Sequence, residues 1–270
     1  MTSPFVLELD GLELECINDM EGGFLRADVE TYFMGDIELS PGATVFDVGA
    51  NIGAFTAAVW SRLGGDVRVF SFEPMPPIRE VLERNVASQM SDVVTVMPCG
   101  LGAEAATLEF SYFPGMTVLS SALRDDAALD AERVRLVKTV MTMIDEGRAY
   151  PLLRPLPREL VEAIVEGHVM HMTQPRKYPA TIRTIEEVRS ELGVEAIDLL
   201  KIDVEGAELS VLEGVDDWSV VRQVAMEVEH FEERSPIVQA LLQAQGFEVS
   251  LRQDAVERSG DYGMVYARRV

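Results

Sequence analysis

Apolar and polar residues alternate at the start of the chain, and this alternation predicts paired strands. In FVLELDGLELECI the alternation continues on both sides of Asp10-Gly11, a dipeptide typical of tight hairpin turns. The segment GATVFDVGANIGAFTAAVWSRLGG then predicts a buried strand over residues 44–46, a glycine turn and a helix. The chain therefore begins with a hairpin followed by a strand–turn–helix unit.

The same alternation of strand and helix patterns continues further along the chain. VRVFSFEP predicts a second strand, PPIREVLERNVASQ a helix, DVVTVMPCGLG a third strand, and ATLEFSYF continues as strand. Strands that alternate with helices are typical of a parallel sheet with right-handed crossovers.

The last third of the chain returns to this pattern. TIEEVRSEL predicts a helix with Thr184 as its N-cap, and AIDLLKIDVEGAELSVLEGV predicts a fourth strand and a helix. VRQVAMEVEHF predicts a fifth strand, and SPIVQALLQAQG predicts a helix with Gly246 at its C-cap. FEVSLRQD and YGMVYARR predict a closing antiparallel pair.

Between these two parts the pattern changes for about seventy residues. The chain from about 114 to 179 has helical periodicity, interrupted by Pro151, Pro155 and Pro157. We interpret residues 1–270 as one domain with a lead-in over 1–43 and a core formed by 44–111 and 180–270. Residues 112–179 would form a helical insertion that covers the substrate as a lid.

Composition excludes several classes of partner. The chain is 47% hydrophobic and 26% charged, which is typical of a globular protein. Its 23 Lys and Arg against 46 Asp and Glu give a net charge of −23, which disfavours nucleic acid and anionic membranes as partners. Two cysteines, Cys16 and Cys99, are too few for a disulfide framework, and neither a signal peptide nor a membrane-spanning stretch is evident. We therefore expect a cytoplasmic protein.

The run VFDVGANIGAF indicates a ligand site between a strand and a helix. Gly49 and Gly53 flank Asn51, and small residues in such a turn let the backbone approach a ligand at a helix N-terminus. Asp47 suits an ammonium or hydroxyl group better than a phosphate. Neither the dinucleotide fingerprint G-x-G-x-x-G nor a P-loop lysine is present.

Glu73 adds a second acid at the end of the next predicted strand. It lies 24 residues after Gly49, where doubly wound folds place an acid that binds ribose hydroxyls. Two acids without a basic partner fit an adenosine that carries an amino-acid group rather than a phosphate chain. S-adenosylmethionine is such a ligand.

Four segments together resemble a known family. VFDVGANIGAF, FSFEPMPPIREVLERN, CGLGAEAATLEF and LLKIDVEGAELSVLEG resemble the FkbM family of S-adenosylmethionine-dependent methyltransferases. FSYFPGMTVLSSAL, RQVAMEVEHF and the C-terminal segment resemble, more narrowly, O-methyltransferase domains of modular polyketide and peptide synthases.

This resemblance implies a fold and an activity. The fold would be a Rossmann-like class I methyltransferase: an α/β, mostly parallel, doubly wound sheet with an antiparallel C-terminal strand and a helical lid. The activity would be O-methylation of a hydroxyl on a polyketide or mixed polyketide–peptide intermediate, carried on an acyl carrier protein. Methylation of a free natural-product hydroxyl or of a carboxylate is the alternative.

The resemblance also assigns site residues. It implies cofactor contacts from the loops after the first, second, third and fourth core strands, at Asp47, Gly49, Ala50, Asn51, Gly53, Phe55, Glu73, Pro74, Gly100, Leu101 and Asp203. It implies catalytic residues at the ends of the fourth and fifth strands, at Lys201, Asp203, Glu227, Glu229 and His230. Relatives often read E-V-H-D where this chain reads E-V-E-H over residues 227–230, so Glu229, His230 and a lid histidine all remain candidates for the base.

The insertion supplies further candidates. His168 and His171 are three residues apart and share a helix face, which leaves three interpretations open: a solvated or packed face, a lid that lowers a histidine onto the substrate, or a zinc site. A zinc site is disfavoured, because neither a carboxylate nor a cysteine accompanies the pair. Asp203, Glu205 and Glu227 could hold Mg²⁺ through oxygen ligands. Such acids also orient a cofactor or base without an ion, so we expect no metal. Met116 and Ser120 are the other residues expected to face the substrate.

Charge distribution distinguishes the insertion from the body. Residues 112–190 hold 11 Lys and Arg against 11 Asp and Glu, whereas the rest holds 12 against 35. An acidic carrier protein would therefore dock near Arg124, Arg133, Arg135 and Lys138, unless these cations only form ordinary i,i+4 pairs. A dinucleotide oxidoreductase is disfavoured by its missing motifs, and a non-catalytic module that retains the fold stays open.

Overall fold

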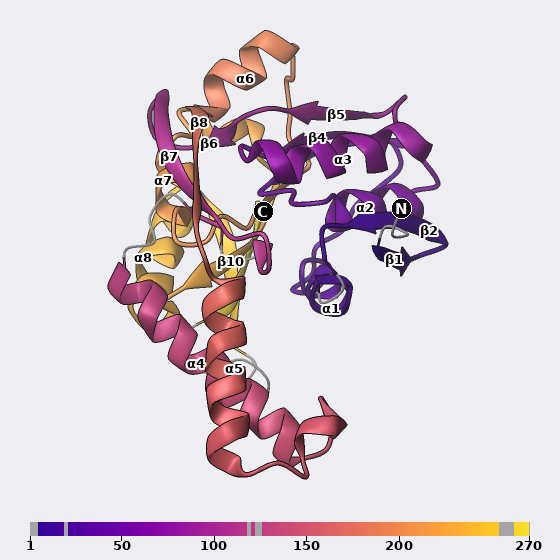
Figure 1. Ribbon diagram of the computed structural model, residues 1–270. Helices are drawn as coiled ribbons and strands as arrows, with labels where there is room; N and C mark the ends of the chain where they lie inside the picture. The colour runs from indigo at the N-terminus through magenta and orange to yellow at the C-terminus, as the bar shows by residue number, and fades with distance from the viewer. Residues whose placement is uncertain (1–4, 19–20, 118–119, 122–125, 254–261, 270) are drawn as a thin grey trace.

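A seven-stranded sheet forms the centre of the protein. The computed structural model describes residues 5–18, 21–117, 120–121, 126–253 and 262–269 (Figure 1). The strand order is β11-β12-β10-β9-β3-β4-β5, where β3 to β5, β9 and β10 are parallel and β12 is antiparallel to both of its neighbours. The strands are β3 (Ala43–Val48), β4 (Val67–Phe72), β5 (Val94–Met97), β9 (Leu199–Ile202), β10 (Gln223–Glu229), β11 (Phe247–Arg252) and β12 (Tyr262–Arg269). This is the doubly wound α/β fold that the sequence predicts.

Helices cover both faces of this sheet (Figure 1). On one face lie α1 (Glu21–Thr31), α2 (Ala54–Arg62) and α3 (Pro76–Gln89), packed on Val45, Leu199 and Ala225. On the other lie α6 (Ile185–Leu192), α7 (Glu208–Glu213), the 3-10 turn η3 (Trp218–Val220) and α8 (Phe231–Ala244), packed on Phe46 and Leu200. Neighbouring residues of a strand point to opposite faces, which is why β3 and β9 are apolar on both sides.

The N-terminal hairpin forms as predicted, and the helix after it is a new element. β1 (Phe5–Leu9) and β2 (Leu12–Cys16) pair around Asp10 and Gly11, whose φ values are 49° and 85°. Asn85 of α3 holds the hairpin by donating to the Glu15 carbonyl at 3.1 Å and accepting from the Glu15 amide at 2.8 Å. Sequence pattern does not predict α1, because Gly22 and Gly23 weaken its helical periodicity.

A separate three-stranded sheet corrects two expectations. Its strands, in spatial order, are β6 (Gly100–Leu101), β8 (Arg176–Arg183) and β7 (Ala106–Tyr112). The chain therefore leaves the central sheet after Met97, whereas Gly100 and Leu101 were expected to end its third strand. β8 begins inside the predicted helical insertion. It was not predicted because it contains Pro179, and proline is unusual inside a strand. The strand tolerates Pro179 because β6 pairs with β8 only at Ile182 and Arg183, which leaves that edge of β8 unpaired at residue 179.

The rest of the insertion is a helical hairpin that extends from the body (Figure 1). We call α4 (Asp126–Asp145), the 3-10 turn η2 (Pro151–Leu153) and α5 (Arg158–Met172) the arm. Met141 and Ile144 of α4 pack against Val161, Val165 and Val169 of α5. Within the described part of the chain, no helix is both long and apolar enough to cross a membrane.

Candidate active site

A cavity of about 450 Å³ lies at the carboxyl ends of the central strands. The chain runs outward from β3 through β4 to β5, and later from β9 to β10 on the other side, so the strand order reverses between β3 and β9. Doubly wound folds bind their ligands at such a switch point. Residues of α1, β7 and α4 close the cavity from the opposite side.

Most of the residues predicted for the site come together here. Those that line the cavity are Gly49, Ala50, Asn51, Phe55, Glu73, Pro74, Gly100, Leu101, Met116, Ser120, Lys201, Asp203 and Glu227. Those that do not are Asp47, Gly53, His168, His171, Glu229 and His230.

The glycine turn brings the first strand against the fourth. Gly49 has φ of 77°, and a Cβ on it would lie 1.7 Å from the Asp203 carbonyl oxygen, so only glycine fits. Gly53 has φ of 91° and precedes α2; its Cβ would meet the Leu82 side chain at 2.7 Å. Gly49 thus shapes the cavity, whereas Gly53 serves the packing of α2 on α3.

Asp47 is not the ligand acceptor that its position in the sequence indicated. It lies inside β3, in register with Lys201 of β9, and is completely buried. Lys201 Nζ lies 3.0 Å from Asp47 Oδ1, and Thr56 donates its hydroxyl to Asp47 Oδ2 at 2.7 Å. The carboxylate therefore neutralises Lys201 instead of facing the cavity.

Lys201 connects this buried acid to the cavity wall. Its ammonium donates to the Gly49 carbonyl at 2.9 Å and lies 3.6 Å from Asp203 Oδ2. Burial lowers the pKa of Lys201, but the charges of Asp47 and Asp203 outweigh it and raise that pKa. Lys201 is therefore a permanent cation that fixes the glycine turn and Asp203.

Glu73 lies where the sequence places it, directly after β4. The side chain is 5% exposed and accepts the Asn51 amide at 3.1 Å and the Met75 amide at 2.9 Å. Burial raises its pKa to about 7, against the opposing effect of these two hydrogen bonds. The carboxyl is thus fixed at the cavity wall, next to the glycine turn.

β10 separates the three candidate bases. Glu227 lines the cavity, whereas Glu229, two residues further on the same face, accepts the Tyr262 hydroxyl at 3.2 Å. The strand continues through Glu229, and His230 then takes a left-handed φ of 50° and starts α8 as an exposed residue. This turn directs the chain out of the site, so of the three candidates Glu227 alone lines the cavity.

Tyr32 is a site residue that the sequence did not reveal. It follows α1, lines the cavity and is 2% exposed, yet its hydroxyl has no hydrogen-bond partner among the described residues. Burial, and then the charges of Asp203, Glu227 and Asp28, raise the pKa of Tyr32 well above its usual range, so the phenol is neutral. A buried hydroxyl without a partner is a point where a ligand can bind.

The arm lines the cavity with residues of α4 and not with the two histidines of α5. Arg135 of α4 reaches the cavity, where its guanidinium lies 3.1 Å from Glu132 Oε2. His168 and His171 are exposed on α5 and do not face the cavity, which corrects their assignment as substrate contacts.

The three described cations among those proposed for docking lie in different surroundings. Arg133 is held by Thr173, to whose hydroxyl and carbonyl it donates at 2.9 and 3.0 Å, and Arg135 is turned to the cavity. Lys138 is exposed, and Arg124 lies outside the described residues.

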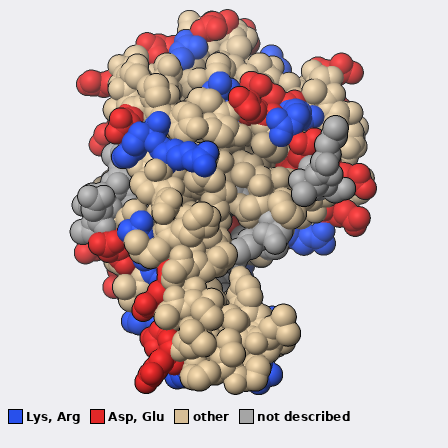
Figure 2. Space-filling model, in the orientation of Figure 1, with Lys and Arg blue, Asp and Glu red and all other residues tan. Residues whose placement is uncertain are grey.

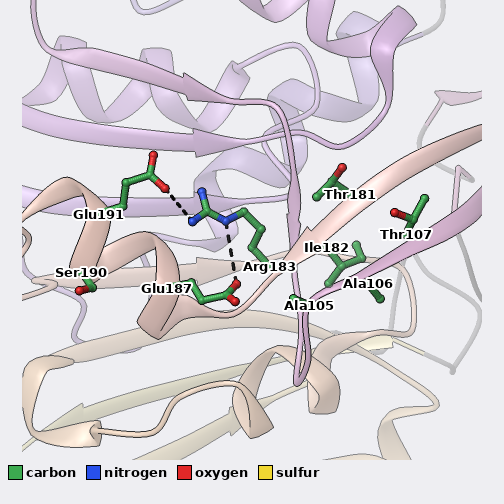
Figure 3. Close-up of a pocket in the computed structure, with 9 residues that line it drawn as sticks. All are labelled: Ala105, Ala106, Thr107, Thr181, Ile182, Arg183, Glu187, Ser190 and Glu191. Carbon is green, nitrogen blue, oxygen red and sulfur yellow. Dashed lines mark hydrogen bonds and ion pairs between the residues drawn. The ribbon is translucent and has the colours of Figure 1, made fainter.

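A second hollow, an open groove, lies beside β7, β8 and α6 (Figure 3). It has fewer charged side chains available to bind a ligand than the first cavity. Its one guanidinium, Arg183, lies 2.7 Å from Glu191 and 3.9 Å from Glu187, so its charge is already offset. Within the ranges that the structure describes, no three His, Cys, Asp or Glu side chains gather as metal ligands.

Comparison with known proteins identifies this architecture. The family model of the methyltransferase FkbM domain matches residues 47–249. The chain is 32% identical to the 31-O-demethyl-FK506 methyltransferase FkbM of Streptomyces tacrolimicus, over 96% of this chain and 95% of that protein. It is 30% identical to the methyltransferase sdnD of Sordaria araneosa, over 99% and 97%.

Two further relatives are longer than this chain. It is 36% identical to the AMB antimetabolite synthetase AmbE of Pseudomonas aeruginosa over 89% of its length, but spans only 11% of AmbE. The crystal structure of methyltransferase FkbM from Methylobacillus flagellatus shares the fold with a TM-score of 0.51 at 16% identity, over 88% of this chain and 47% of that one.

Proposed function

Because the chain belongs to the FkbM family of methyltransferases, we propose that it is an S-adenosylmethionine-dependent O-methyltransferase. Its substrate would be a hydroxyl on a polyketide or mixed polyketide–peptide intermediate held by an acyl carrier protein. The observation that supports this most is the cavity itself, which joins a carboxylate-rich wall at the strand ends to an apolar wall from β7, β8 and α4.

The carboxylate-rich wall fits the cofactor. When bound, S-adenosylmethionine supplies a methyl group on a positively charged sulfur. Glu73 offers a fixed carboxyl for ribose hydroxyls beside the glycine turn, and Asp203 and Glu227 provide negative charge for the sulfonium. The unsatisfied Tyr32 hydroxyl is a donor for the amino-acid end. Lys201, whose charge Asp47 and Asp203 offset, adds little positive charge to this wall.

The apolar wall fits an acyl chain. Its side chains come from β7, β8 and the start of the arm: Leu108, Phe110, Met116, Leu136 and Ile182. Glu227 is our candidate for the base, since it lines the cavity where Glu229 and His230 do not. When bound, the cofactor would supply its methyl group to the substrate oxygen, and the Glu227 carboxylate would accept the proton that the hydroxyl loses.

Two relatives support the finer parts of this proposal. The name of the Streptomyces tacrolimicus relative specifies a 31-O-demethyl substrate, which supports oxygen as the acceptor atom. AmbE is named a synthetase, and this chain matches only a small part of it, which supports a setting in which intermediates are carried by a larger assembly.

The test is intact mass spectrometry of a carrier protein loaded with a 3-hydroxyacyl group, incubated with enzyme, S-adenosylmethionine and EDTA. The proposal predicts a mass gain of one methyl, about 14 Da. The same acyl group offered free tests the alternative substrate; methylation of the free form alone would refute the carrier-bound part of the proposal.

Two variants test the base. We expect Glu227→Gln to lower kcat by about a hundredfold or more, and His230→Ala to leave it within about twofold. Binding of S-adenosylhomocysteine, measured by calorimetry, shows that each variant retains its site. An unchanged rate in Glu227→Gln would contradict Glu227 as the base. A strong loss of rate would argue against a carboxylate substrate, because transfer to a carboxylate needs no base.

A further inference from the structure

The helix α5 has two apolar faces, and among the residues that the structure describes only one of these faces packs against another element. Val161, Val165 and Val169 are buried against α4. At about 100° per residue, a second set falls on the opposite side of the helix and is between 38% and 50% exposed. Its large members are Leu156, just before the helix, Leu160, Ile164 and Met170.

Acidic residues are confined to a third face of the helix. Glu159, Glu162 and Glu166 are all exposed and fall together, beside the outer apolar face rather than on it. Figure 2 shows the arm with a broad uncharged surface and acidic side chains along one edge. The outer face thus carries His171 near its C-terminal end, is otherwise apolar, and is bordered by acidic residues.

The spacing on this face is that of a helix–helix seam. Leu160, Ala163, Gly167 and Met170 follow one another on α5 at intervals of three, four and three residues. A Cβ on Gly167 would meet nothing within 4 Å, so this glycine is not required by packing inside the chain. A glycine inside a helix is destabilising relative to alanine. Gly167 and Ala163 have small side chains, so the backbone of another helix can approach the middle of this face closely.

We propose that this face pairs with the same face of a second copy, giving a twofold dimer of arms. The seam has large side chains at both ends and small ones at its centre, so a twofold axis through the centre lets two seams fit each other.

Charge selects the arm as the place where two copies meet. The arm, residues 126–172, holds 6 Lys and Arg against 8 Asp and Glu, whereas the remainder of the chain holds 17 against 38, so contacts between two bodies are repulsive. The arm projects from the body (Figure 1), and crossed arms keep the two acidic bodies apart.

The first test is sedimentation velocity of the full chain, with Gly167→Arg and Glu162→Arg as a matched pair. Both positions are exposed on α5, and Gly167 has open space around it, so both variants should keep the helical circular dichroism of the wild type. We expect the wild type and Glu162→Arg to be dimers, and Gly167→Arg to have a dimer Kd raised more than tenfold. A monomeric wild type, or a Gly167→Arg variant that dimerises as tightly, would overturn the proposal.

A crosslink tests the geometry independently. The native Cys16 and Cys99 are buried, so a new exposed thiol is the reactive one. In Ala163→Cys the two thiols would lie near the twofold axis, and mild oxidation should trap a disulfide dimer much faster than in Glu162→Cys. Equal rates for the two variants would overturn the proposal, and neither assay depends on methyl transfer.

Discussion

Removing the Lys201 ammonium should destabilise the protein strongly, because it leaves Asp47 charged and buried. Asp47 is 0% exposed, and the charge of Lys201 lies 3.0 Å away. At an effective dielectric constant of about 20, two unit charges at that distance attract by about 5 kcal/mol. Part of this attraction only offsets desolvation, and breaking a buried pair from one side costs about 3–5 kcal/mol. We expect a loss of that size in Lys201→Met.

The assay is urea denaturation at pH 7 over a double-mutant cycle of Lys201→Met and Asp47→Asn. Lys177→Met is the matched control, since Lys177 lies 3.7 Å from Glu109 in a pair whose side chains are 52% and 69% exposed. Such an exposed pair contributes under about 1 kcal/mol. The double variant should lose less than the sum of the two single losses, because it leaves no unpaired charge inside.

The outcome that refutes this reasoning is specific. If Lys201→Met costs no more than Lys177→Met, or if the two single losses simply add, Asp47 and Lys201 do not stabilise each other as a buried pair. If Lys201→Met is too unstable to purify, the double variant and Asp47→Asn still decide the question, because the double variant should then fold where the single one does not.

Three further variants probe the wall of the cavity. Gly49→Ala should lower the free energy of unfolding by at least about 3 kcal/mol in urea denaturation, because the new Cβ would lie 1.7 Å from the Asp203 carbonyl oxygen. The control Gly42→Ala, at a residue with φ of 81° and open space around it, should lower it by only about 1–2 kcal/mol. Equal losses would contradict the close approach of Gly49 to Asp203. Tyr32→Phe removes a buried hydroxyl without a partner, so the free protein should gain up to about 1–2 kcal/mol while calorimetry shows weaker binding of S-adenosylhomocysteine; unchanged affinity would exclude Tyr32 as a ligand contact. The fold raises the pKa of Glu73 from 4.5 to about 7, so between these pH values the native state keeps a proton that the unfolded state has lost. The free energy of unfolding of the wild type therefore falls as pH rises from 4.5 to about 7. Glu73→Gln removes this loss, and its stability relative to the wild type should therefore improve by up to about 3 kcal/mol between pH 4 and pH 8; a constant difference would show that Glu73 titrates normally.

Local signals in the sequence predicted the elements that depend on local chemistry. Thr184 caps α6 as expected. Its hydroxyl accepts a hydrogen bond from the Glu187 amide, and the Glu187 carboxylate accepts one from the Thr184 amide, which together form a capping box. The hairpin at Asp10 and the five parallel strands follow in the same way from turn residues and apolar runs. Glu73 was found because its distance from Gly49 along the chain reflects one strand and one helix.

What the sequence could not give was the direction of a side chain relative to partners far along the chain. Asp47 looked like a ligand acceptor until the register of β3 with β9 placed it opposite Lys201. The sequence pattern made His230 a candidate base, but its left-handed φ after β10 directs the chain away from the cavity. Tyr32 carried no motif, since only the docking of α1 on the sheet brings it to Asp203 and Glu227. Each of these depends on tertiary contacts, which no short pattern encodes.

The hydrogen bond from Lys201 to the Gly49 carbonyl joins residues 152 positions apart, and it therefore sets the order in which the protein can mature on the ribosome. The first three parallel strands and their helices are complete by Met97, but the wall that Lys201 and Asp203 provide does not exist until the arm and β8 have been synthesised. Contacts of such long range are slow to form, because the loop between them must be closed first. The nascent chain therefore exposes an open sheet edge at β3 for the whole time needed to translate the insertion, and that edge is where a chaperone, or another nascent chain, would bind.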